Sequence, residues 1–64
     1  MNKYSWGFNK SADLFFNTGN SIEECLSEAI KQSENCFCRV YIGENKKAQN
    51  TPTYYVENIV EYQI

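Results

Sequence analysis

The sequence predicts an α+β domain in which one amphipathic helix packs on one face of a small antiparallel sheet of three or four strands. Three observations carry this prediction: alternating apolar residues near the N-terminus, a helix-capping motif that opens an apolar stripe at helical spacing, and a second clean alternation after it. The order is strand, strand, helix, strand and then a C-terminal strand or helix. With 64 residues and no repeat or internal linker, residues 1–64 are expected to form one domain.

The first strand is expected over residues 3–9, where Tyr4, Trp6 and Phe8 share one side of an extended chain. Residues 9–13 offer turn chemistry, and the apolar run 14–16 is predicted to return as a short second strand of a hairpin. Residues 17–20 should then break the chain before the helix.

The helix is the strongest local signal. Ser21 followed three residues later by Glu24 is a capping box, in which the Ser21 hydroxyl and the Glu24 carboxylate each accept a backbone N–H of the other residue. The apolar residues that follow recur every three or four positions, as on one face of a helix: Ile22, Cys25, Leu26, Ala29 and Ile30. Glu28 and Lys31 should form a weak surface pair, and the helix should end within residues 33–35, where Asn35 suits a left-handed cap.

The next strand is expected over residues 36–43. One of its faces is uniformly apolar and should lie against the helix: Cys36, Cys38, Val40 and Ile42. The reverse face carries Phe37, Arg39 and Tyr41. Residues 43–47 are interpreted as a turn that opens a polar loop ending at Pro52.

The last segment, residues 53–64, fits two structures. As a strand it places an apolar face on one side, interrupted by Asn58; as a helix it aligns Val56, Ile59, Val60 and Ile64. Its β-branched and aromatic residues favour the strand.

Composition excludes several classes of function. The chain has eight acidic and six basic residues, a net charge of -2 and no histidine, so neither general acid–base catalysis near neutral pH nor strong phosphate attraction is favoured. No segment has the length of a membrane span or the pattern of a signal peptide, which predicts a cytoplasmic protein. No small-molecule ligand, cofactor, metal or catalytic residue is implied, and we expect no enzyme.

The predicted faces allow three cysteines, Cys25, Cys36 and Cys38, to converge between the helix and the sheet. Without histidine or a Cys-x-x-Cys pair they lack the usual zinc-binding spacing, and an odd number favours reduced thiols. Packing in the core is the favoured interpretation, with a disulfide and a metal site as alternatives.

The order of these signals resembles small phage- and prophage-encoded proteins of unknown function. The likeness runs through residues 6–8, 21–29, 40–44 and 56–61, that is, Trp-Gly-Phe, Ser-Ile-Glu-Glu, Val-Tyr-Ile-Gly-Glu and Val-Glu-Asn-Ile-Val-Glu. In those proteins the last piece reads as the start of a helix. The resemblance implies no chemistry, but it implies an accessory role inside a host bacterium.

The surface that remains is the face carrying Phe37, Arg39 and Tyr41, and three interpretations are open. The C-terminal segment folds over this face; or the face binds a protein, either a second copy of the chain or a target, since Tyr, Phe and Arg are enriched at interfaces; or it stacks single-stranded nucleic acid, with Arg39, Lys46 and Lys47 on phosphates and Tyr41 on a base. Our hypothesis is a non-catalytic protein-binding or assembly module, with single-stranded nucleic-acid binding as the alternative.

Overall fold

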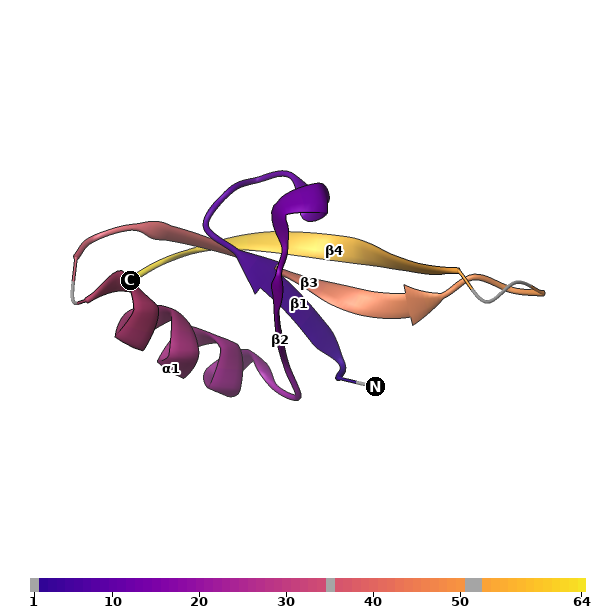
Figure 1. The fold of residues 1–64 in the computed structure, drawn as a ribbon, viewed down its shortest axis with the longest axis horizontal. Coiled ribbons are helices and arrows are strands. Elements are labelled where there is room, and N and C mark those ends of the chain that lie inside the picture. The colour runs from indigo at the N-terminus through magenta and orange to yellow at the C-terminus, as the bar shows by residue number, and fades with distance from the viewer. Residues whose placement is uncertain (1, 35, 51–52) are drawn as a thin grey trace.

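A computed structural model describes residues 2–34, 36–50 and 53–64, and in this part of the chain it forms a four-stranded antiparallel sheet with one α-helix (Figure 1). The expected α+β class is confirmed. The elements are β1 (Tyr4–Gly7), the 3-10 turn η1 (Ala12–Leu14), β2 (Asn17–Gly19), α1 (Ile22–Ser33), β3 (Arg39–Lys47) and β4 (Tyr54–Gln63). In space the strands follow the order β2-β1-β3-β4, every neighbouring pair being antiparallel.

The second strand lies three residues later than predicted. Residues 14–16 were expected to pair with β1, but the chain first closes η1, in which the Leu14 N–H donates to the Ser11 carbonyl at 3.0 Å. The strand β2 then pairs with β1 with Gly19 opposite Tyr4, and Phe16 is 81% exposed. The prediction of a strand over residues 14–16 was wrong. It relied on the apolar and aromatic character of these residues, whereas the local hydrogen bonds of η1 keep the chain out of the sheet until residue 17.

The helix confirms the capping motif with one difference. The Ser21 hydroxyl accepts the Glu24 N–H at 3.0 Å, whereas the Glu24 carboxylate accepts the N–H of Asn20 at 3.1 Å, one residue earlier than expected. Glu28 and Lys31 form the expected surface pair at 3.5 Å. The helix ends at Ser33, and Glu34 takes the left-handed cap at φ 56°; Asn35, the expected cap, lies outside the described residues.

Strand β3 is longer than predicted and begins later. Val40 and Ile42 are buried beneath the helix as expected, but Cys36 and Phe37 precede the strand, and residues 43–47 are strand where a turn was predicted. These polar residues stay extended because both neighbours pair with them: the Asn45 N–H donates to the Lys3 carbonyl at 2.8 Å, and Lys47 lies opposite Tyr54 of β4. Pro52, the predicted end of the loop, lies outside the described residues.

The C-terminal segment is a strand. A bulge interrupts β4, because Ile42 pairs with Val60 while Glu44 pairs with Glu57, and Asn58 takes a φ of 55° to make room for the extra residue. The bulge reverses the alternation, so the single apolar face predicted for this segment is split. Val60 shares the helix side with Ile42, whereas Val56 lies on the outer side.

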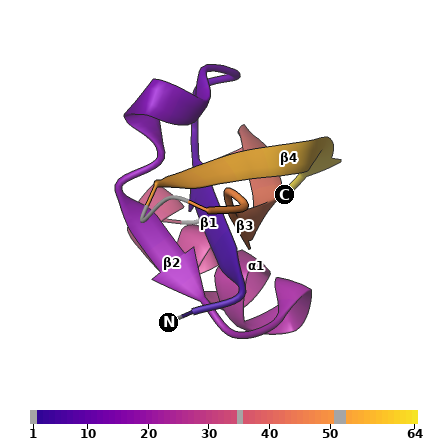
Figure 2. The same cartoon turned by 90° about the vertical axis from the view of Figure 1, so that its right-hand side faces the viewer.

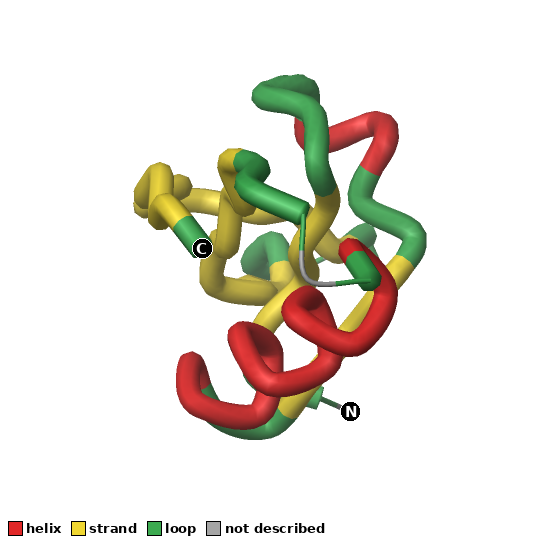
Figure 3. The backbone as a smooth tube through the Cα atoms, turned by 90° about the vertical axis from the view of Figure 1, so that its left-hand side faces the viewer, coloured by secondary structure: helices red, strands yellow, loops and turns green. Residues whose placement is uncertain are grey.

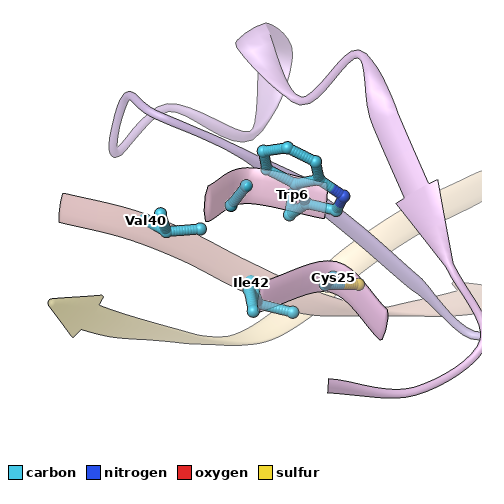
Figure 4. Packing of buried hydrophobic residues seen from close by; sticks show 5 residues of the cluster. Trp6, Cys25, Val40 and Ile42 are labelled. Carbon is cyan, nitrogen blue, oxygen red and sulfur yellow. The ribbon is translucent and has the colours of Figure 1, made fainter. Parts of the chain in front are cut away.

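The core is small and lies between α1 and the middle of the sheet (Figure 4). Its buried members are Trp6, Cys25, Ala29, Val40 and Ile42. Helix α1 packs against β1, β2 and β3 and forms a layer on one side of the sheet (Figure 3). Among the described residues, no helix is long and apolar enough to cross a membrane.

The β3–β4 hairpin projects beyond this core as an arm, which points to the right in Figure 1 and toward the viewer in Figure 2. The arm gives the molecule its elongated shape, with extents of 42 × 19 × 16 Å. One consequence is that much of β4 lies outside the region that α1 covers.

Candidate protein-docking surface

The free edge of β4 is the longest unpaired strand edge in the described structure. The strand has ten residues and pairs on one side only, with β3, whereas the opposite edge of the sheet is formed by the three-residue β2. An edge strand presents N–H and C=O groups that can pair with another chain. The free edge of β4 is therefore the candidate docking surface.

The hydrogen-bond pattern identifies which groups of β4 point outward. Cys38 and Ile64 exchange both backbone hydrogen bonds, at 3.2 and 3.0 Å, so they form a hydrogen-bonded pair. Because such pairs alternate with non-bonded ones along an antiparallel ladder, Glu61 and Gln63 belong to the non-bonded set. The N–H and C=O groups of Glu61 and Gln63 thus face away from β3, toward the free edge.

Apolar side chains accompany this edge on the helix side of the sheet. Val60 is 48% exposed although its cross-strand neighbour Ile42 is buried, and Ile30 at the end of the helix stripe is 45% exposed. Tyr62 is half-buried at the margin of the core. Val60 is exposed because α1 packs mainly against β1, β2 and β3.

A depression of about 360 Å³ lies at the C-terminal end of β4, beside the last turns of α1. Its walls are mostly apolar: Ile30, Ser33, Cys36, Phe37, Gln63 and Ile64. A second depression of about 280 Å³ adjoins it and shares Ser33 and Cys36. An apolar side chain of a docked segment can be accommodated beside Ile30 and Ile64.

The structure separates the three residues of the predicted binding face. Phe37 precedes β3, is 91% exposed and lines the depression beside Ile64, whereas Arg39 and Tyr41 lie on β3. The C-terminal segment does not fold over their face, because β4 extends the sheet beside β3. The interpretation in which the tail covers these aromatics is therefore wrong, and Phe37 is open to solvent.

Arg39 and Tyr41 both interact with Glu61 of β4. The Tyr41 hydroxyl donates to the Glu61 carboxylate at 2.9 Å, and the Arg39 guanidinium lies 3.9 Å from the same carboxylate. The bond to Glu61 raises the pKa of Tyr41 above its ordinary value of 10.0. These three residues, which we call the outer-face group, link β3 to β4 on the face of the sheet opposite the helix.

The two lysines of the nucleic-acid alternative lie on the arm. Lys46 is directly opposite Tyr55 and Lys47 directly opposite Tyr54, and the two tyrosines are about half exposed, at 47% and 54%. The Lys46 ammonium is 3.6 Å from the Glu44 carboxylate. Lysines and aromatics are therefore paired at the arm, away from Arg39 and Tyr41.

The three cysteines do not converge. Cys25 is buried, Cys38 is half-buried and Cys36 is exposed, and all three are free thiols. Burial raises the pKa of the Cys25 thiol above 9.0, with a smaller contribution from the Glu24 carboxylate. Among the described residues no three His, Cys, Asp or Glu side chains come together as a metal site.

Sequence reasoning missed the free edge of β4 because it did not settle whether residues 53–64 form a strand. Even if residues 53–64 were known to form a strand, their sequence would not show that this strand lies at the edge, because strand order is a property of the whole sheet. One signal was present: β-branched and aromatic residues are dense in a segment whose only charges are Glu57 and Glu61.

Comparisons of this chain with protein-family models, with curated proteins and with solved structures find no match.

Proposed function

We propose that this chain is a non-catalytic protein-binding module that docks an extended protein segment along the free edge of β4. The observation that carries the proposal is the ten-residue strand β4, which pairs on one side only and has Val60 48% exposed. Strand addition at such an edge is a recurrent mode of peptide recognition.

Two kinds of contact would support a docked segment. The outward N–H and C=O groups of Glu61 and Gln63 supply backbone hydrogen bonds, which give affinity with little dependence on sequence. The exposed Val60 side chain and the depression beside Ile30 and Ile64 supply apolar contacts, which give a preference for apolar side chains at alternate positions.

The Cys25 thiol and the Tyr41 phenol are both poor candidates for a nucleophile. Burial raises the pKa of Cys25, and the hydrogen bond to Glu61 raises the pKa of Tyr41. An upward shift lowers the fraction of thiolate or phenolate at neutral pH, which is the opposite of what a nucleophile or general base needs. The resemblance to phage-encoded proteins fits a module that occludes a surface of a host or phage component in the bacterial cytoplasm.

Selection of displayed peptides tests this proposal. A library of random twelve-residue peptides is panned against the whole chain, and selected peptides are titrated into ¹⁵N-labelled protein. We expect the largest amide shifts at Glu61 and Gln63, whose backbone groups face the free edge.

A matched pair of variants separates edge pairing from side-chain contact. Gln63→Pro removes an N–H that β3 does not use, whereas Gln63→Ala removes the same side chain and keeps the N–H. The selected peptides should bind Gln63→Ala within about threefold of the wild type and lose at least tenfold on Gln63→Pro. Peptides that bind both variants equally, or that shift amides only on β2 and α1, would overturn the docking edge.

The paired lysines and tyrosines of the arm favour a second candidate, the binding of single-stranded nucleic acid. Lys46 and Lys47 would contact phosphates, while Tyr54 and Tyr55, directly across the hairpin, would stack on bases. Fluorescence anisotropy with a labelled oligothymidine at 20 and 200 mM salt tests it. Binding that falls steeply with salt and is lost in Lys46→Gln/Lys47→Gln supports this candidate, and no binding at low salt removes it.

A further inference from the structure

We infer that the segment which docks on β4 is β4 of a second copy of this chain, paired about a two-fold axis that passes beside Tyr62. The inference rests on the proposed docking edge and names its occupant. It joins two four-stranded sheets into one continuous antiparallel sheet.

The outward groups limit the possible registers. A two-fold axis normal to the sheet keeps both copies' side chains on matching faces, and the outward-facing residues Glu61 and Gln63 must form the hydrogen-bonded pairs. Placing Glu61 opposite Gln63 of the second copy satisfies both conditions. The two symmetric pairs would supply about four backbone hydrogen bonds, since each such pair exchanges two.

Charge selects this register over its neighbour. If each strand slipped so that Glu61 lay opposite Glu61 of the second copy, two carboxylates would face each other directly, which is destabilising. When Glu61 lies opposite Gln63 of the second copy, its carboxylate instead meets a side-chain amide that can donate a hydrogen bond to it. The carboxylate retains the acceptor capacity for this bond while it accepts from Tyr41.

The same register matches the apolar side chains on the helix side. Val60 comes opposite Ile64 of the second copy, and Tyr62 comes opposite its own symmetry mate. The 48% exposed Val60 would then lie in the strip of sheet between the two copies' helices. Both helices lie on one face of the joined sheet, and Ile30 and Phe37 of each copy border the strip.

The bulge at Asn58 limits the pairing. It interrupts the regular ladder directly before residues 60–63, so a second strand can add regularly only along the C-terminal part of β4. A short, register-specific contact is expected from this geometry. An open edge without a bulge would allow slippage and further addition.

The small core explains why a second copy is a favourable occupant. The chain exposes 4588 Å², against roughly 4,200 Å² for a compact protein of this mass, and among the described residues the buried core cluster has five members. Domains of this size commonly gain stability from oligomerisation. A second copy is present wherever the chain is made, so the exposed edge would be covered without any other partner.

Disulfide trapping tests the register. The background is Cys36→Ser/Cys38→Ser, which leaves only the buried Cys25. In this background Tyr62→Cys places one new thiol on each copy. In the proposed register the Cα atoms of the two residues are about 4.5 Å apart, within the range that a disulfide spans. Mild oxidation at micromolar protein should give a covalent dimer. Val60→Cys alone should not crosslink, and Val60→Cys/Ile64→Cys should.

The register is overturned if Val60→Cys alone gives a covalent dimer. It is also overturned if neither the Tyr62→Cys chain nor the Val60→Cys/Ile64→Cys chain gives one. Light scattering on the unmodified chain provides a second measurement, free of any folding defect that cysteine introduces. The wild type and Gln63→Ala should have twice the mass of the 7.5 kDa chain, and Gln63→Pro should have the mass of one chain.

The outcomes separate this inference from the docking edge. A monomeric wild type that still binds selected peptides in a Gln63→Pro-sensitive manner would overturn self-pairing and leave the docking function standing. A monomer that binds no peptide at β4 would overturn both. A dimer unaffected by Gln63→Pro would place the interface on another surface and overturn self-pairing.

Discussion

Gly19 and Cys25 approach so closely that a methyl group at position 19 would lie 2.7 Å from the Cys25 sulfur. Gly19 is the last residue of β2, and Cys25 lies in the first turn of α1, where it is fully buried. The contact brings the helix down onto the sheet at the point where the chain leaves β2. Glycine is needed at position 19 because of this packing.

Gly19→Ala should therefore destabilise the fold by about 1–3 kcal/mol, the usual cost of adding a methyl to a packed site. Urea unfolding followed by the fluorescence of Trp6, the only tryptophan and a buried one, measures the change. Repeating Gly19→Ala in a Cys25→Ala background should recover at least about 0.5 kcal/mol of that cost. Equal costs in the two backgrounds would show that the sulfur is not the obstacle.

The bulge in β4 supplies a second prediction. A Cβ at Gly43 would collide with the side chains of Val56 and Ile59, which close over the glycine on the outer face. Gly43→Ala should thus lower the free energy of unfolding by about 1–3 kcal/mol, because Val56 and Ile59 must move. The same urea experiment checks it, with Ser27→Ala on the exposed side of α1 as the control that should change little. An unchanged stability would contradict this packing.

Local signals predicted the parts of the fold that local physics determines. The Ser21 cap, the helix stripe and the burial of Val40 and Ile42 follow from spacing and hydrogen-bonding groups within a few residues. The second strand was misplaced because residues 14–16 are apolar yet carry the local bonds of η1. Nothing in that segment reveals that Gly19 must face Cys25.

The candidate site was harder to predict because it depends on strand order and on a bulge. Phe37, Arg39 and Tyr41 alternate correctly in the sequence, but the strand begins at Arg39, so Phe37 leaves their face. The free edge of β4 arises because β4 pairs outside β3, while α1 packs mainly against β1, β2 and β3. Both features are long-range, and single-sequence periodicity carries no information about them.

The capping group at the start of α1 gives a third prediction. Ser21→Ala removes the acceptor of the Glu24 N–H and should cost about 1 kcal/mol. Ser21→Asp keeps an acceptor beside the positive end of the helix and should cost less than half as much. Both values come from urea unfolding, and an alanine variant as stable as the wild type would remove the cap from the account of helix stability.

Alkaline pH should weaken the fold through Cys25. The pKa of this thiol is raised in the folded chain, mainly by burial, so its contribution to stability is complete below about pH 9 and is lost as the pH rises through the folded-state pKa. The urea midpoint should fall between pH 9 and 11 in the wild type. Cys25→Ala, less stable at pH 7, should fall less over that range, and parallel curves for the two proteins would contradict the assignment.

Tyr41 and Glu61 provide the most direct test of the outer-face group. The carboxylate accepts the phenol hydrogen and so favours the protonated phenol, which raises the pKa of Tyr41, while the Arg39 guanidinium opposes the shift. Glu61→Gln should lower this pKa toward 10.0, and Arg39→Gln should raise it further. The Tyr41 ring carbon bonded to oxygen, followed by ¹³C NMR from pH 8 to 12, reports it separately from the other four tyrosines. Asp13→Asn, the same charge change on η1, should leave the pKa of Tyr41 unchanged. If Glu61→Gln also leaves it unchanged, the hydrogen bond does not form in solution, and the outer face of β4 would hold Glu61 free for a partner.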